Sequence, residues 1–133
     1  MRDSRLSHSR RVLIADALAD RCDALRVLLT LWGHKVAVAS DGPAALATAA
    51  GFRPDAALLD LDLPGLDGFA VARRLRRSRA LDGVLLLAVT ATDTALERAR
   101  CRAAGFDRRL VVPFDPEELR TLLERGTVQP LRA

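Results

Sequence analysis

The chain has 133 residues, half of them hydrophobic, which suits one domain with a buried core and excludes a disordered chain. Its net charge of +4 comes from arginine, with Lys35 as the single lysine, and few aromatic side chains are available for base stacking. This composition disfavours nucleic-acid binding, and two cysteines without metal-ligand spacing argue against a disulfide framework or a structural zinc site.

Short apolar runs recur along the chain and predict five strands. These runs cover residues 12–15, 36–40, 56–59, 84–89 and 110–112. The third and fourth runs have no polar alternation, which is typical of strands buried on both faces of a parallel sheet.

Helix signals fill the intervals between these strands. The start signals are an N-cap residue or a first-turn proline at Asp20, Gly42–Pro43, Asp67, Thr94 and Asp115–Pro116. Gly33, Gly51 and Gly105 are expected to end three of the helices.

Five strands that alternate with five helices predict a doubly wound parallel α/β sheet with helices on both faces. We expect residues 1–10 to be a flexible extension, residues 11–126 the folded domain and residues 127–133 a tail. Because no apolar run could span a bilayer and the N-terminus lacks an apolar signal core, we expect a cytoplasmic protein without membrane contact.

Ligands of such sheets bind where the strands end, so the residues after each strand are the candidate site. Asp16 and Asp60 follow the first and third strands, and Thr90 follows the fourth. Neighbouring carboxylates favour a divalent cation, which would neutralise a phosphoryl group while one carboxylate attacks it. The pattern therefore indicates a phosphoryl-accepting pocket.

Four segments carry a family resemblance: VLIAD at 12–16, LLDLDLPGLDG at 58–68, AVTA at 88–91 and VVPF at 111–114. In order and spacing they resemble the signature stretches of receiver domains of bacterial two-component response regulators. The resemblance covers about residues 11 to 125. It implies a flavodoxin-like, three-layer α/β/α fold with strand order 2-1-3-4-5.

The resemblance also implies site roles and partners. Asp60 would be the phosphoacceptor, Asp16, Asp60 and Asp62 would form a Mg²⁺ site, and Thr90 would bond the phosphoryl group and act as a switch. The partner would be a histidine kinase or a phosphotransfer protein. A homodimer would form through the face made by the fourth helix, the fifth strand and the fifth helix, and the Val112–Pro113 bond would be cis.

Three positions depart from the family pattern. Ala17 replaces a second acid that normally binds magnesium, Val112 replaces a lysine, and Arg109 replaces the aromatic or histidine switch residue. We expect weak Mg²⁺ binding, weak or absent phosphorylation and a role in protein–protein interaction. Two compensations are hypotheses: the Asp62 side chain replaces the lost acid, or the Arg109 guanidinium replaces the lost lysine.

Two other function classes stay open from the residues alone. Asp60-Leu61-Asp62 has the DxD form of phosphatases with an Asp nucleophile, although no lysine follows it, so we expect no enzyme. The arginine run could bind nucleic acid, but a solvated helix face is the expected reading. This run consists of Arg73, Arg74, Arg76, Arg77 and Arg79. The kinase, the oligomeric state and whether the domain stands alone are not determined by the sequence.

Overall fold

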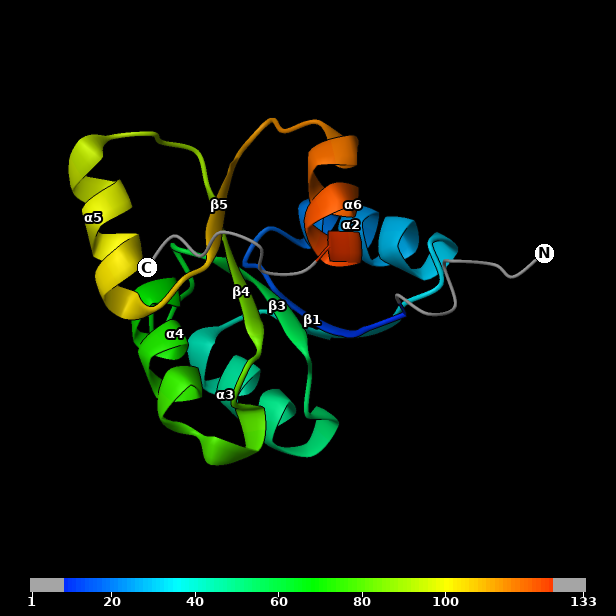
Figure 1. Cartoon of the computed structure of the whole chain (residues 1–133), viewed down its shortest axis with the longest axis horizontal. Coiled ribbons are helices and arrows are strands. Elements are labelled where there is room, and N and C mark those ends of the chain that lie inside the picture. Colours follow the sequence, from blue (N-terminus) through cyan, green and yellow to red (C-terminus); the bar gives the residue numbers. More distant parts are fainter. Residues whose placement is uncertain (1–8, 126–133) are drawn as a thin grey trace.

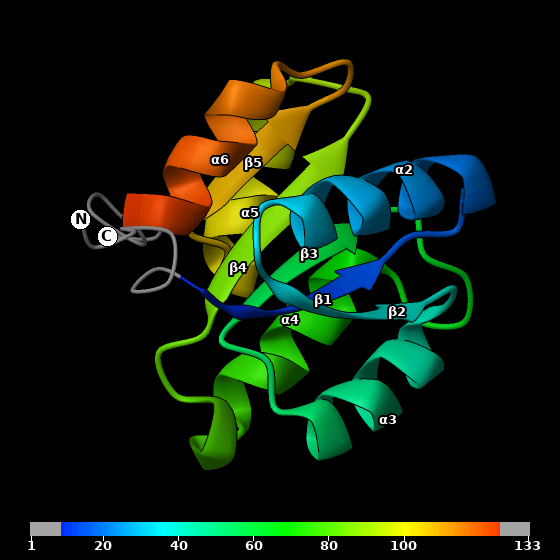
Figure 2. The ribbon, with the colours of Figure 1, turned by 90° about the vertical axis from the view of Figure 1, so that its right-hand side faces the viewer.

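A parallel sheet forms the centre of the computed structural model, which describes residues 9–125. Nearly all of the expected N-terminal extension and the whole expected tail lie outside the described residues. The strands are β1 (Arg11–Ala15), β2 (Lys35–Ala39), β3 (Ala56–Asp60), β4 (Leu85–Thr90) and β5 (Arg108–Val111). Their order, β2-β1-β3-β4-β5, confirms the predicted fold (Figure 2).

Helices cover both faces of this sheet (Figure 1). Helices α2 and α6 pack on one face, and α3, α4 and α5 pack on the other. The bounds are α2 (Ala19–Leu31), α3 (Gly42–Phe52), α4 (Gly68–Arg77), α5 (Ala95–Ala104) and α6 (Pro116–Arg125), with a short 3₁₀ helix, η1 (Arg79–Leu81), after α4. Every helix in residues 9–125 is too short or too polar to cross a membrane.

The two central strands supply side chains to both layers of the core. Leu59 and Leu86 lie in the cluster beneath α3, α4 and α5, whereas Leu58 and Leu87 lie in the cluster beneath α2 and α6. All residues of β3 and β4 are buried, which confirms the prediction from their unbroken apolar runs.

Most of the predicted helix ends are confirmed. The carboxylate of Asp67 accepts a hydrogen bond from the amide of Ala70, and the hydroxyl of Thr94 accepts one from Glu97. Both side chains thus satisfy first-turn amides that have no partner within the helix. Asp67 therefore has the structural role of a helix cap.

Two predicted helix ends are wrong. Asp20 lies in the first turn of α2 and does not cap it, because the chain turns directly after β1 and the helix already begins at Ala19. Gly51 lies within α3, which continues to Phe52 and ends at Arg53 with a left-handed φ of 55°. The following proline explains the end of α3, since its ring disfavours helical geometry in the residue before it.

The strand order decides where the candidate site lies. β1 and β3 are neighbours, and β4 lies on the other side of β3. Because all strands are parallel, the residues at their carboxyl ends meet at one edge of the sheet. Asp16, Asp60 and Thr90 are therefore brought together as predicted.

Candidate functional site

Two buried carboxylates form the centre of the site. Asp16 follows β1 and is 2% exposed, while Asp60 ends β3 and is 4% exposed. The amide of Ala17 donates a hydrogen bond to Oδ2 of Asp60 at 3.2 Å, which links the two strand ends. The amide of Leu18 donates to Oδ1 of Asp16 at 2.8 Å, and that of Asp62 donates to Oδ1 of Asp60 at 2.9 Å.

Arg21, from the first turn of α2, supplies a positive charge to both carboxylates. Its Nε lies 2.5 Å from Oδ2 of Asp16, and its Nη2 lies 3.0 Å from Oδ1 of Asp16 and 3.4 Å from Oδ2 of Asp60. The hydrogen bond with Asp16 is the main cause that raises the pKa of Arg21 above its ordinary value, against the opposing effect of burial. The guanidinium is thus charged at every physiological pH.

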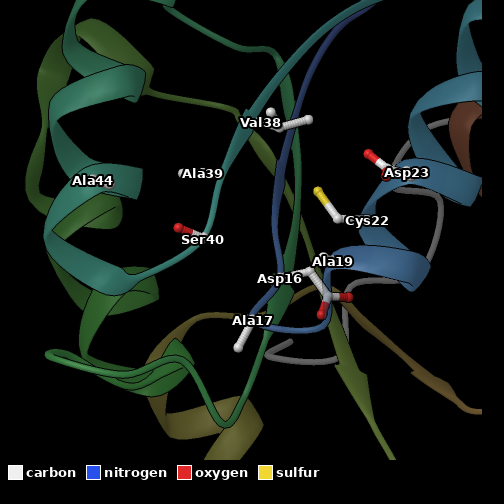
Figure 3. A pocket seen from close by; sticks show the side chains of 9 residues that line it. All are labelled: Asp16, Ala17, Ala19, Cys22, Asp23, Val38, Ala39, Ser40 and Ala44. Carbon is white, nitrogen blue, oxygen red and sulfur yellow. The ribbon is translucent and has the colours of Figure 1, made fainter.

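A cavity of about 330 Å³ opens over Asp60. It is lined by Ala17, Leu18, Arg21, Asp60, Asp62, Thr90 and Ala91. A second hollow of about 390 Å³ lies on the other side of Asp16, between α2, β2 and α3 (Figure 3). Figure 3 shows that Ala17, next to Asp16, has only a methyl group as its side chain. This side chain therefore cannot supply a carboxylate as a further metal ligand.

The residues of this site do not fit a divalent cation well. Within residues 9–125, no group of three or more acidic, histidine or cysteine side chains is arranged to hold a metal ion. The family resemblance implies the backbone carbonyl of Asp62 as a further ligand, whereas its side chain, the hypothetical replacement for the lost acid, is exposed. The oxygen atoms of Asp16 and Asp60 already accept N–H donors. Mg²⁺ requires nearly octahedral oxygen coordination, which these groups do not offer as arranged.

Thr90 lies at the edge of the cavity, as expected. Its Oγ1 accepts a hydrogen bond from the amide of Thr92 at 3.2 Å and lies 3.4 Å from the Thr92 hydroxyl. That hydroxyl donates to Glu97 at 2.6 Å, which connects the end of β4 to the first turn of α5. Thr90 therefore satisfies a local amide and also faces the pocket.

The structure does not support Arg109 as the substitute cation over Asp60. The side chain of Arg109 bonds the loop after β4 instead, because its Nη2 donates to the carbonyl of Thr92 at 3.2 Å and to Asp93 at 2.8 Å. Hydrogen bonds from Arg109 and from Arg98 lower the pKa of Asp93 below its ordinary value. A carboxylate close to β5 thus holds Arg109 away from the pocket.

Val112 occupies the position where the family pattern has a lysine. Its side chain packs partly against the apolar cluster beneath α2 and α6, and its peptide bond to Pro113 is cis, as the resemblance implied. Val112 offers no charge to the cavity over Asp60, so the site lacks this phosphoryl partner.

The arginine run on α4 and at the start of η1 divides into two environments. Arg73, Arg74, Arg77 and Arg79 are exposed, which agrees with the expected solvated face. Arg76 instead turns inward, where its Nη2 lies 2.6 Å from the buried carboxylate of Asp107.

The two cysteines pack in the core. Both Cys22 and Cys101 are buried and free. Burial raises the pKa of the Cys101 thiol to about 11, so the nucleophilic thiolate is scarce at neutral pH.

Arg21 is the site residue that sequence reasoning missed. The signal available was a basic residue five positions after Asp16, close enough to fold back over the strand end. The position alone could not show which carboxylate it would reach, because a guanidinium on a long flexible stem has many accessible rotamers.

Comparisons with known proteins agree with the fold. The response regulator receiver domain model matches residues 12–124. The response regulator MprA of Mycolicibacterium vanbaalenii is 40% identical over 121 residues, which are 88% of this chain and 52% of that protein. MprA of Mycobacterium avium is also 40% identical, over 86% of this chain and 51% of that protein. The chain thus spans about half the length of these relatives.

Solved structures extend the comparison. The structure of the Vibrio cholerae chemotaxis protein CheY4 matches with a TM-score of 0.83 at 28% identity. The match covers 88% of this chain and 98% of CheY4. The receiver domain of the sensor histidine kinase PA1611 of Pseudomonas aeruginosa has a TM-score of 0.82 at 29% identity, with 91% of this chain covering 99% of it. That structure has a magnesium ion coordinated in its active site cleft.

Proposed function

Because this chain belongs to the response regulator receiver domain family of two-component signalling, we propose that it is an atypical receiver with weak or absent phosphorylation. Asp60 is its phosphoacceptor position, and Thr90 is the residue that would bond a phosphoryl group there. Receiver domains are in general signalling modules and not enzymes, and we propose no turnover of a substrate. The proposed location is the cytoplasm.

The observation that carries this proposal is the loss of charged groups around Asp60. Ala17 and Val112 stand where the family has an acid and a lysine, and the described residues show no ion pair between Arg109 and Asp60. A hydrogen bond between charged groups is worth about 1.5–3 kcal/mol, so the absence of the lysine alone would weaken phosphoryl binding considerably. Weak Mg²⁺ binding is part of the same proposal.

Phosphorylation is tested by intact-mass spectrometry after incubation with acetyl phosphate and Mg²⁺. We expect only a minor phosphoryl adduct on the wild-type chain and none on the Asp60→Asn variant. An adduct on most wild-type molecules that is absent from Asp60→Asn would identify Asp60 as acceptor but contradict weak phosphorylation. An adduct on both chains would contradict Asp60 as the acceptor.

Response regulators interact with histidine kinases and phosphotransfer proteins, and we propose such a protein as one partner of this chain. We further propose that the face formed by α5, β5 and α6 binds a second copy. Leu96, in the first turn of α5, supports this proposal because it is apolar and 72% exposed. Burial of one leucine side chain contributes about 1.5–3 kcal/mol, enough to change a dimer affinity.

The dimer is tested with the Leu96→Glu variant by sedimentation velocity over a range of concentrations. We expect its dimerisation constant to weaken about tenfold, which corresponds to about 1.4 kcal/mol. Leu31→Glu is the matched control, because Leu31 is equally exposed at 73% but lies at the end of α2, which packs on the face of the sheet opposite α5. Equal association of all three proteins would argue against this interface.

A further inference from the structure

The acidic pocket already contains a cation that belongs to the chain. Asp16 and Asp60 are both almost fully buried at adjacent strand ends, where like charges repel and lose their hydration. Such a pair is stable only when a positive charge or several N–H donors compensate for the lost water. In this pocket Arg21 provides the positive charge.

The geometry of Arg21 matches this task. Two N–H groups of its planar guanidinium face the two oxygen atoms of Asp16 at 2.5 and 3.0 Å, and Nη2 also lies 3.4 Å from Asp60. An arginine fork binds a carboxylate through two parallel hydrogen bonds and holds it in one orientation. The side chain is only 24% exposed, so solvent screens these interactions less than those of a surface pair.

Backbone amides complete the coordination of the same oxygen atoms. Ala17 and Asp62 donate to the two oxygens of Asp60, and Leu18 donates to Oδ1 of Asp16. Each of the four carboxylate oxygens thus faces at least one N–H donor. A hydrated divalent cation could bind here only after the guanidinium had moved, since both would need the same oxygens and would repel each other.

We propose that Arg21 is a built-in counter-ion that takes the place of the divalent cation in this pocket and keeps its Mg²⁺ affinity low. The proposal deepens the function proposed above and rests on it. It makes Arg21 a positioning residue that orients Asp16 and Asp60 without a metal ion.

The test is isothermal titration calorimetry of MgCl₂ into the wild-type chain and five variants. Arg21→Gln removes the charge that competes with the cation, and it should lower the Kd for Mg²⁺ about tenfold, which corresponds to about 1.4 kcal/mol. Arg21→Lys keeps the charge and should bind Mg²⁺ more weakly than Arg21→Gln. Ala17→Asp restores the missing acid, and we expect the tightest binding when it is combined with Arg21→Gln.

Arg26→Gln is the matched control because Arg26 is on the same helix but pairs only with the exposed Asp23, at 3.9 Å. Its Mg²⁺ affinity should equal that of the wild type. The proposal is overturned if Arg21→Gln binds Mg²⁺ no more tightly than Arg26→Gln. If Arg21→Gln does not fold, the Arg21→Lys and Ala17→Asp variants decide the question. Arg21→Lys keeps the positive charge, so the proposal is overturned if this variant binds Mg²⁺ as tightly as an Ala17→Asp chain that binds Mg²⁺.

Calorimetry separates this inference from the proposed function. Extensive phosphorylation of the wild type would contradict the proposed function, yet the ranking of Mg²⁺ affinities would still support Arg21 as the counter-ion. Equal Mg²⁺ affinities in Arg21→Gln and the wild type would overturn the inference, even if phosphorylation is as weak as proposed.

Discussion

The Asp107→Ala variant is expected to lose about 3–5 kcal/mol of its free energy of unfolding, because it removes one partner of a buried ion pair. Asp107 is 1% exposed, and its Oδ2 lies 2.6 Å from Nη2 of Arg76 and 2.8 Å from the amide of Leu86. Alanine would leave the charge of Arg76 without this carboxylate and the Leu86 amide of β4 without this acceptor. Urea denaturation followed by circular dichroism measures the loss.

Two variants distinguish the stability lost with the buried pair of Arg76 and Asp107 from a general effect of removing a charge. Asp23→Ala removes a carboxylate from the exposed pair with Arg26 and should cost less than about 1 kcal/mol. The double variant Arg76→Met with Asp107→Ala should recover part of the loss, since the guanidinium that faces Asp107 is removed together with the carboxylate. A loss below about 1 kcal/mol in Asp107→Ala would show that water replaces the carboxylate at little cost.

The Val112→Lys variant is expected to accept a phosphoryl group from acetyl phosphate about 10- to 150-fold faster than the wild type. The reason is a single charge-assisted interaction of about 1.5–3 kcal/mol between the new ammonium group and the phosphoryl oxygens. Val112 follows β5 directly and packs only partly into the core, so a lysine there can extend toward the end of the sheet. The measurement is the rate of adduct formation by intact-mass spectrometry.

Val27→Lys is the matched control, because Val27 is exposed on α2 and the substitution adds the same charge away from the β5 end. The Val112→Lys adduct should disappear when Asp60→Asn is added. Equal rates in Val112→Lys and Val27→Lys would mean that the missing lysine does not limit phosphorylation. The occupation of the acidic pocket by Arg21 would then be the cause of weak phosphorylation.

The fold could be predicted because its signals are local. The apolar runs over β3 and β4 have no polar alternation, and only a sheet covered on both faces buries such strands completely. Asp67 and Thr94 could be assigned as helix starts because a cap bonds amides only three residues away. Where a nearby turn or proline competed, at Asp20 and Gly51, the local signal gave the wrong end.

The position of the two central acids could also be predicted. Asp16 and Asp60 each end an apolar strand, and in a parallel sheet all such ends lie on one edge. The residues themselves thus determined that these carboxylates lie at the same edge of the sheet, and the strand order, which makes β1 and β3 neighbours, brings them together.

The partners of the long charged side chains were decided by the tertiary structure. From the sequence, Arg21 was one residue of a predicted helix, Arg76 was a member of a basic run and Arg109 was a candidate substitute cation. In the fold they pair with Asp16, Asp107 and Asp93. An arginine side chain has several rotatable bonds and reaches acids that are distant in sequence, so its partner depends on how the elements pack. The sequence by itself therefore determined the receiver fold and its acidic edge, and only the packing of α2 against that edge decided which cation occupies it.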